Sequence, residues 1–155
     1  MNKKSAGIIL YRFNKKILEV LLIHPGGPFW ASKDKGVWSI PKGEFEDSED
    51  ALQAAKREFE EELGSAVQAD QYIELTAVTS KSRKKVYCFA AAGDLDTENI
   101  KSNVISIEWP PRTGKRIEIP EVDKAEWFDI KTAKEKILTY QLPLIEELVK
   151  KMADV

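Results

Sequence analysis

The sequence predicts one α/β domain, an α/β/α sandwich in which helices flank a mixed β-sheet. Three observations lead to this prediction: β-rich runs on both sides of residues 43–66, an amphipathic helix within those residues, and two helical segments near the C-terminal end. With 155 residues, 43% of them hydrophobic and 32% charged, the chain can bury the core of one such domain. We therefore expect a single domain over residues 1–155.

The first strands are predicted by β-rich runs bounded by turn and loop residues. Residues 5–13 and 18–24 flank a turn at 14–16, which predicts a hairpin. A loop interrupted by glycine and proline follows over residues 25–36. Residues 37–40 are expected to form a short strand after that loop.

The central helix is predicted within residues 43–66. Asp47 or Ser48 can cap its start, and the acidic residues there suit the first turn of a helix dipole. Gly64 supplies the helix stop. At about 100° per residue, one stripe holds the residues expected to face the core: Leu52, Ala55, Phe59 and Leu63.

The second half of the chain alternates short apolar runs with turns and ends in helices. Residues 72–79 and 86–91 are expected to form a hairpin around the basic run 81–85. The remaining predicted elements are a strand at 102–109, a basic, proline-containing loop at 110–119, a strand at 121–128, and helices at 131–137 and 142–152. These helices complete the layers of the predicted sandwich.

Three glutamates of the central helix indicate a chemical role. Glu58, Glu61 and Glu62 lie together beside the apolar stripe, because residues three and four apart are neighbours on a helix. Their mutual repulsion brings no structural gain, and a hard divalent cation such as Mg²⁺ or Mn²⁺ would remove it. The alternative is a solvated acidic face.

Composition excludes several other classes of function. A net charge of −2 gives no general attraction to nucleic acid or to acidic membranes. With Cys88 as the only cysteine and His24 as the only histidine, an internal disulfide, a cysteine-rich zinc site and a multi-histidine site are excluded. No apolar run has the length of a signal peptide or of a membrane span, so we expect a cytoplasmic protein.

Residues 43–65 resemble the signature, or box, of the Nudix hydrolase family. The matching positions are Gly43, Glu49, Arg57, Glu58, Phe59, Glu61, Glu62 and Gly64. Ser65 departs from the pattern, because the family has an apolar residue there. The preceding segment 38–43, Trp-x-x-Pro-Lys-Gly, is similar to the segment that leads into the box in these proteins. The resemblance implies the Nudix fold, an α/β/α sandwich.

The resemblance also implies roles for the box residues. Glu58, Glu61, Glu62 and the Gly43 carbonyl would hold Mg²⁺ or Mn²⁺. Arg57 would pair with Glu49 and steer Glu61, which supports the metal ligands. The general base is left open between Glu61, Glu62 and Glu121, since some family members use an acid from a later loop.

Substrate contacts are expected from cations and one aromatic residue outside the box. Lys42 adjoins Gly43 and is expected to contact a phosphate. Lys85 and Tyr87 alternate onto one strand face, and a tyrosine in a similar segment of diadenosine polyphosphate hydrolases stacks on adenine. Arg112, with Lys115 and Arg116, lies in the basic loop and is expected to clamp distal phosphates. The loop around Trp30 can border the nucleotide.

The family cleaves a nucleoside diphosphate linked to another group, so the expected partner is a small-molecule nucleotide. A dinucleoside polyphosphate such as diadenosine tetraphosphate is the leading substrate. The alternatives are a MutT-like pyrophosphatase acting on nucleoside triphosphates or nucleotide sugars, and a Nudix module that senses a nucleotide without cleaving it. We expect neither a membrane nor a specific nucleic acid as partner, and a monomer or a homodimer.

Overall fold

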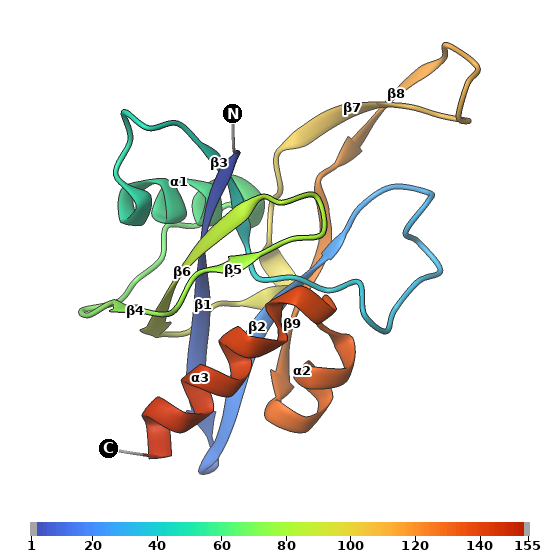
Figure 1. Cartoon of the computed structure of the whole chain (residues 1–155). Coiled ribbons are helices and arrows are strands. Elements are labelled where there is room, and N and C mark those ends of the chain that lie inside the picture. The colour runs from blue at the N-terminus through green and yellow to red at the C-terminus, as the bar shows by residue number, and fades with distance from the viewer. Residues whose placement is uncertain (1–2, 154–155) are drawn as a thin grey trace.

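The computed structural model describes residues 3–153, so residues 1–2 and 154–155 of the predicted domain lie outside the described part. Figure 1 shows a twisted sheet with helix α1 on one side and helices α2 and α3 on the other. The α/β/α sandwich with a mixed sheet is therefore confirmed. The acidic face of α1 lies beside the N-terminal end of β1 (Lys4–Asn14), the central strand of the sheet.

The main sheet is mixed, with the strand order β4-β6-β1-β2-β9, in which the edge strand β4 is Ile73–Glu74. β1 (Lys4–Asn14) and β2 (Ile17–Pro25) make the predicted hairpin, with Lys15 and Lys16 in the turn. β6 (Lys85–Ala92) pairs with β1 in parallel, while β9 (Val122–Asp129) pairs with β2 antiparallel. The parallel pair needs a long crossover between β1 and β6, which includes α1.

The main sheet also contains the short strands β3 and β5, which lie outside that order. Two of the predictions for this region are wrong. β3 (Lys42–Phe45) pairs with the first residues of β1. The strand predicted at 37–40 is reduced to isolated bridges, because the chain there crosses between β2 and the end of α2. The strand predicted at 72–79 is divided into β4 (Ile73–Glu74) and β5 (Val78–Thr79), which pair with different ends of β6.

Helix α1 spans Ala51–Leu63 and begins later than the sequence predicts. Asp50 is the N-cap, and its Oδ2 accepts a hydrogen bond from Gln53 N at 3.1 Å. A cap at Asp47 or Ser48 is therefore wrong, and the first turn contains no acidic residue. The preceding residues 46–49 close a separate turn, which delays the start of the helix.

The other end and the apolar side of α1 agree with the prediction. Gly64 takes the left-handed conformation with φ of 83°, and its N–H donates to Glu60 O. Ala55, Phe59 and Leu63 are buried, whereas Leu52 is only half-buried. Glu58 and Glu62 are buried as well, so their carboxylates lie in a wall of the molecule rather than on a solvated face.

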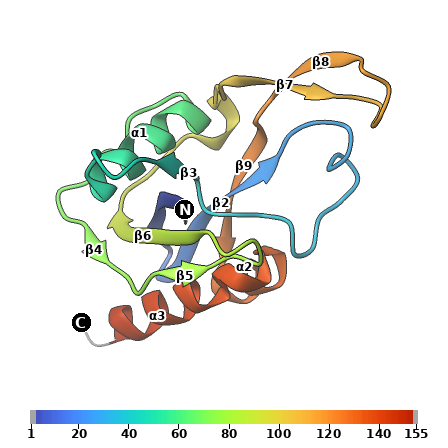
Figure 2. The ribbon, with the colours of Figure 1, turned by 45° about the horizontal axis from the view of Figure 1, so that its top comes forward.

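Residues 104–120 form an arm that is separate from the main sheet. β7 (Val104–Glu108) and β8 (Arg116–Pro120) pair antiparallel as a two-stranded sheet. Figures 1 and 2 show this arm extending away from the main sheet in two different views. The predicted loop at 110–119 is therefore wrong for its second half, where alternating exposed and half-buried residues form a strand.

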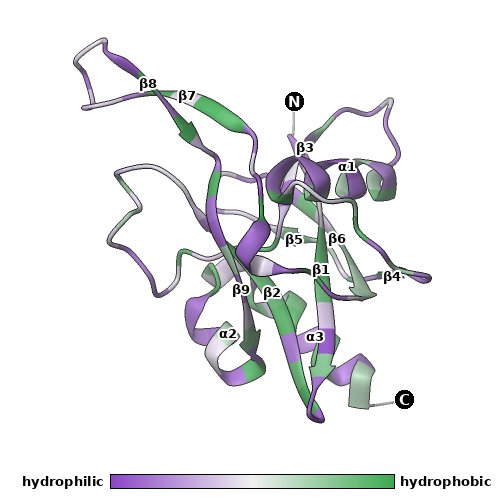
Figure 3. Ribbon diagram, turned by 180° about the vertical axis from the view of Figure 1, so that it is seen from behind, coloured by the Kyte–Doolittle hydropathy of each residue, from purple (hydrophilic) through white to green (hydrophobic). Residues whose placement is uncertain are grey.

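Two clusters of buried side chains hold the layers together. On one side of the sheet, Ala6, Ile8 and Leu10 of β1 pack against the apolar side of α1. On the other side, Ile9 packs against α2 (Ile130–Lys136) and α3 (Leu142–Ala153). A 3₁₀ turn at Thr97–Asn99 lies between β6 and β7, and another at Thr139–Gln141 lies between α2 and α3. Figure 3 shows the apolar residues along the sheet and polar residues over much of the outer face of α1.

Candidate active site

The three box glutamates lie where α1 meets β3. Lys42 N, the first amide of β3, donates to Glu62 Oε1 at 2.9 Å and holds that carboxylate against the strand. Gly43 follows, and a Cβ built there would lie 1.9 Å from Glu58 Oε2. Any side chain at position 43 would displace Glu58. The glycine is therefore required by the close approach of a carboxylate to the backbone.

These glutamates line a polar cavity of about 410 Å³, which we call the acidic cavity. Its lining residues are Ser5, Lys42, Gly43, Glu44, Glu58, Glu61, Glu62, Lys84 and Glu121. Five carboxylates and two ammonium groups give the fully ionised cavity a formal charge of −3. Glu121, far from the box in sequence, arrives at the start of β9 and faces the same space.

Arg57 contacts three carboxylates of the box. Its Nε donates to Glu49 Oε2 at 2.9 Å, and its Nη2 donates to Glu49 Oε1 at 3.0 Å. Nη1 donates to Glu58 Oε1 at 2.7 Å and to Glu61 Oε1 at 3.2 Å. Arg57 thus orients two carboxylates of the cavity while a bidentate contact with Glu49 fixes its own position.

Burial and like charge shift the titration of the cavity. Burial, followed by the nearby charge of Glu121, raises the pKa of Glu62 to about 8. Burial also raises the pKa of Glu58, although the hydrogen bond from Arg57 opposes that shift. The protein therefore holds these carboxyl groups together against their desolvation cost, a pattern that is typical of functional sites.

The chemistry of the acidic cavity fits a hard divalent cation. Its donors are oxygen atoms, which Mg²⁺ and Mn²⁺ prefer, and Mg²⁺ keeps several waters, so few protein ligands are enough. Over residues 3–153, no three acidic, histidine or cysteine side chains are already gathered around one point. In this structure, Glu58 and Glu61 contact the guanidinium of Arg57.

The raised pKa of Glu62 predicts how stability depends on pH. Between the ordinary value of 4.5 and about 8, the unfolded chain has lost this proton and the folded protein retains it. The free energy of unfolding therefore falls as pH rises through this range, on the order of a few kcal/mol. Mg²⁺ should offset the loss by binding the ionised carboxylate. Thermal unfolding at pH 5.5 and 8.5 should show a larger stabilisation by Mg²⁺ at pH 8.5.

Two variants check this assignment. Glu62→Gln should lose the extra fall in stability between pH 5.5 and 8.5, whereas Glu60→Gln on the exposed side of α1 should retain it. An unchanged pH dependence in Glu62→Gln would show that another group causes the fall.

A second cavity, mainly apolar and about 250 Å³ in volume, adjoins the acidic cavity. The two share Lys42, Glu62 and Glu121, and the indole of Trp30 lines the apolar side. The loop that carries Trp30 is held by His24, whose Nδ1 contacts Asp123 Oδ1 at 2.8 Å and whose Nε2 contacts Lys33 O at 2.7 Å. Trp30 therefore borders the apolar cavity, and its place beside a nucleotide stays a prediction.

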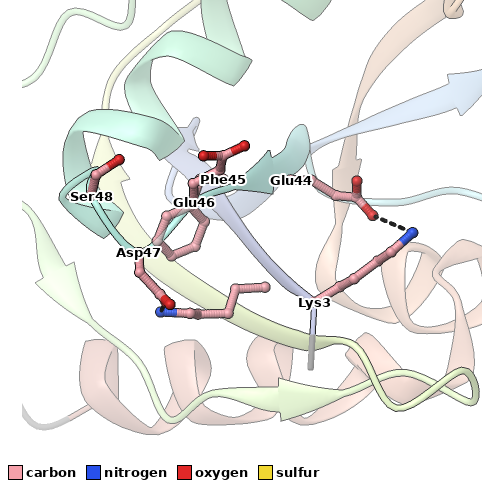
Figure 4. Close-up of a pocket in the computed structure, with 7 residues that line it drawn as sticks. Lys3, Glu44, Phe45, Glu46, Asp47 and Ser48 are labelled. Carbon is pink, nitrogen blue, oxygen red and sulfur yellow. Dashed lines mark ion pairs between the residues drawn. The ribbon is translucent and has the colours of Figure 1, made fainter. Parts of the chain in front are cut away.

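Two further cavities lie beyond Glu44. One, of about 580 Å³, is bordered by Lys3, Lys4 and residues 44–48. Figure 4 shows Lys3 paired with Glu44, a contact of 3.9 Å, and Asp47 and Ser48 on the loop that leads into α1. The other, of about 540 Å³, is bordered by Lys4, Thr79, Arg83, Lys85 and Tyr87.

Lys85 and Tyr87 share one face of β6, as predicted, and Val86 and Cys88 are buried on the other. Lys85 Nζ lies 4.9 Å from the centre of the Tyr87 ring, which in turn meets Phe45 edge-to-face at 5.9 Å. This combination of ring and cation suits a nucleobase with its phosphates. Neither residue lines the acidic cavity itself.

Arg112 and Arg116 are placed on the arm, away from the cavities described above. Arg116 donates from Nε to Ser106 Oγ and from Nη2 to Ser106 O, at 3.2 and 2.9 Å. The turn that contains Arg112 is fixed by Glu108, which accepts from Arg112 N and Gly114 N. Neither arginine lines the acidic cavity or its neighbours, so their contact with distal phosphates stays a prediction.

Sequence reasoning did not single out three residues of the acidic cavity: Ser5, Glu44 and Lys84. Lys84 lies just before β6, at the end of the basic run 81–85 that the sequence assigns to the tip of a hairpin. Ser5 and Glu44 are brought to the cavity by the pairing of β1 with β3, which sequence spacing does not reveal. The region of the acidic cavity outside the box is therefore a tertiary feature.

Comparisons with known proteins agree with this arrangement. The family model described as NUDIX domain matches residues 1–148. Nudix hydrolase 7 of Arabidopsis thaliana is 30% identical over 106 residues, which cover 63% of this chain and 36% of that protein. The chain thus spans little more than a third of the length of this relative.

Solved structures show the same fold at low identity. The NUDIX domain of Shewanella oneidensis NrtR, complexed with ADP ribose, has a TM-score of 0.67 at 16% identity and covers 98% of this chain and 89% of its own. A C. elegans Ap4A hydrolase binary complex has a TM-score of 0.65 at 19% identity, covering 97% and 99%. No helix within residues 3–153 is long and apolar enough to cross a membrane. Because the family model spans nearly the whole sequence and the box residues lie around one acidic cavity, this chain belongs to the Nudix family.

Proposed function

We propose that this protein is a hydrolase of phosphoanhydride bonds whose active site is the acidic cavity. Glu58, Glu61, Glu62 and the Gly43 carbonyl would hold Mg²⁺ or Mn²⁺, and Nudix hydrolases generally use divalent metal ions. The observation that carries the proposal is the gathering of five carboxylates, two of them buried, in one cavity of charge −3. When bound, the cation neutralises phosphate charge and lowers the pKa of a water molecule.

The chain's own residues have separate tasks in this proposal. Arg57 keeps Glu58 and Glu61 oriented through its contact with Glu49. Lys42 Nζ, at the border of the acidic and apolar cavities, donates to a phosphate oxygen. The general base is a carboxylate of the cavity: Glu61, Glu62 or Glu121. Each lies in the cavity where the attacking water must sit.

The neighbouring cavities favour a dinucleoside polyphosphate such as diadenosine tetraphosphate as substrate. The apolar cavity beside Trp30 adjoins the acidic cavity directly, so a nucleoside bound there places its first phosphates among the carboxylates. The Tyr87 cavity shares Lys4 with the cavity beside Lys3, and that cavity shares Glu44 with the acidic cavity. This separation suits a second nucleoside at the far end of a longer chain of phosphates. A substrate with one base, such as a nucleoside triphosphate or a nucleotide sugar, would place a base in only one of these two cavities.

Hydrolysis of diadenosine tetraphosphate should therefore yield ATP and AMP rather than two molecules of ADP. The asymmetry follows from the cavities, because one base would lie in the cavity that adjoins the acidic cavity and the other in a cavity that shares no lining residue with it. The measurement is chromatography of the products formed with Mg²⁺, with nucleoside triphosphates, nucleotide sugars and ADP-ribose in the same panel. Cleavage into two ADP would contradict the asymmetric site.

The same panel separates the alternatives. Cleavage of nucleoside triphosphates without cleavage of diadenosine tetraphosphate would support a MutT-like pyrophosphatase. Binding of a nucleotide without any turnover would identify a sensing module. The presence of all box carboxylates and of Arg57 in one network argues against that module.

A further inference from the structure

A serine of the central strand has a hydroxyl group with no partner inside the acidic cavity. Ser5 is fully buried and lines the cavity, yet its Oγ makes no hydrogen bond. Within residues 3–153, it is the only buried side-chain nitrogen or oxygen in this condition. A buried hydroxyl without a partner destabilises the folded state. Such a group in a binding cavity calls for a partner that arrives with the ligand.

The same wall carries an ammonium group, that of Lys84. Ser5 pairs with Glu44 of β3 and with Val86 of β6, so these three side chains share one face of the sheet. Lys84 lies directly before β6, and its side chain lines the acidic cavity together with Ser5 and Glu44. Its backbone is held by Ser80, whose Oγ accepts from Lys84 N at 3.1 Å. The ammonium of Lys84 contacts Glu44, and both residues line the acidic cavity.

Glu44 is the present partner of Lys84 and is a weakly bound one. Lys84 Nζ lies 2.8 Å from Glu44 Oε1, but the side chain of Glu44 is 53% exposed. Exposed ion pairs of this kind contribute little to stability. Glu44 also has a second cation, Lys3, at 3.9 Å, so its carboxylate stays neutralised if Lys84 turns away. Lys84 can therefore exchange this carboxylate for a more highly charged anion.

We propose that Lys84 Nζ and Ser5 Oγ form an anion-binding wall, which takes a non-bridging oxygen of a phosphoryl group from the substrate. This inference rests on the proposed function, because the anion is the phosphoanhydride that the acidic cavity would cleave. The cavity is negative overall, and a bound cation covers only the side of the box glutamates. A polyphosphate needs donors on the remaining side, and the wall supplies an ammonium and a hydroxyl group there. Glu44 holds Lys84 in place until the substrate arrives.

Calorimetric binding of methylenediphosphonate, a diphosphate analogue that cannot be hydrolysed, tests the wall in the presence of Mg²⁺. Lys84→Met should raise the Kd by about tenfold to a hundredfold, the range for a charge-assisted contact. Lys84→Arg should recover most of the affinity. Lys81→Met removes the same charge from the exposed tip of the same hairpin and should change the Kd by less than about twofold.

Ser5→Ala tests the wall through two measurements, the melting temperature and the Kd for methylenediphosphonate. Removing an unpartnered buried hydroxyl should leave the melting temperature unchanged or raise it. The Kd for methylenediphosphonate should nevertheless rise, by roughly threefold to tenfold for one neutral hydrogen bond. A serine with a purely structural role would show the reverse, a lower melting temperature and an unchanged Kd.

The outcomes separate this inference from the proposed function. Wild-type affinity in Lys84→Met and Ser5→Ala would overturn the wall, whatever the protein hydrolyses. Weakened binding in both variants, together with no hydrolysis by the wild type of any nucleotide in the panel, would keep the wall and overturn the hydrolase. If the wild type with Mg²⁺ does not bind methylenediphosphonate, the wall is overturned as well.

Discussion

Glu61→Gln is expected to lower kcat by on the order of 10²–10⁴-fold while the protein stays folded. The side chain of Glu61 is 45% exposed, and its Oε1 accepts a hydrogen bond from Arg57 Nη1 at 3.2 Å. The amide fills the same space but cannot carry the negative charge that a metal ligand or a general base needs. Unfolding by heat should therefore change little, and the loss should appear in turnover on the substrate that the panel identifies.

Glu58→Gln should lower kcat by a factor of the same order. Glu60, between Glu58 and Glu61 in the sequence, provides a matched control. Glu58 is buried against Gly43 and accepts from Arg57 Nη1 at 2.7 Å, so this variant also tests the orienting network. Glu60→Gln removes a carboxylate from the exposed side of the same helix and should keep near-normal kcat. Near-normal turnover in Glu61→Gln or Glu58→Gln would remove that residue from the site. An equal loss in Glu60→Gln would indicate damage to the helix instead.

Removal of divalent cations should abolish hydrolysis, which is the second large effect. Five glutamate side chains line the acidic cavity, and the substrate brings further negative charge. Without a cation, that repulsion opposes substrate binding before any bond is broken. Mg²⁺ or Mn²⁺ should restore activity to the chelated protein. Ca²⁺ should support it poorly, because its larger and looser coordination shell fits badly with carboxylates fixed on one helical turn.

The assay is hydrolysis in excess chelator, followed by titration with each cation in turn. Full activity in excess chelator would contradict the metal assignment. Equal activity with Ca²⁺ and Mg²⁺ would leave the cation requirement in place, but would show that the site does not select by coordination geometry.

The sequence predicted the part of the site that depends on local spacing. Glu58, Glu61 and Glu62 lie within about one helical turn, so the helix alone brings them to one face. Arg57 belongs to the same helix, and its contacts with Glu49 and Glu61 follow once the box is recognised. Even here, the burial of Glu62 was not predicted, because it depends on the amide of Lys42 in a neighbouring strand.

Features that depend on packing between distant segments were not available from the sequence. The helix begins at Asp50 rather than at Asp47 or Ser48, since the preceding residues form their own turn. Residues 116–120 form a strand of the arm because β7 is there to pair with them, although the prolines and the glycine nearby are typical of a loop. Ser5 and Lys84 reach the cavity through the register of β1 with β3 and β6.

Binding of Mn²⁺ to the nucleotide-free protein, followed by electron paramagnetic resonance, tests the central claim most directly. The claim is that the box glutamates of α1 form a divalent-cation site within the acidic cavity. Wild-type protein and Glu60→Gln should bind Mn²⁺ with similar affinity, and Glu61→Gln and Glu62→Gln should bind it much more weakly. Equal Mn²⁺ binding by all four proteins would contradict the claim, because the cation would then be held elsewhere.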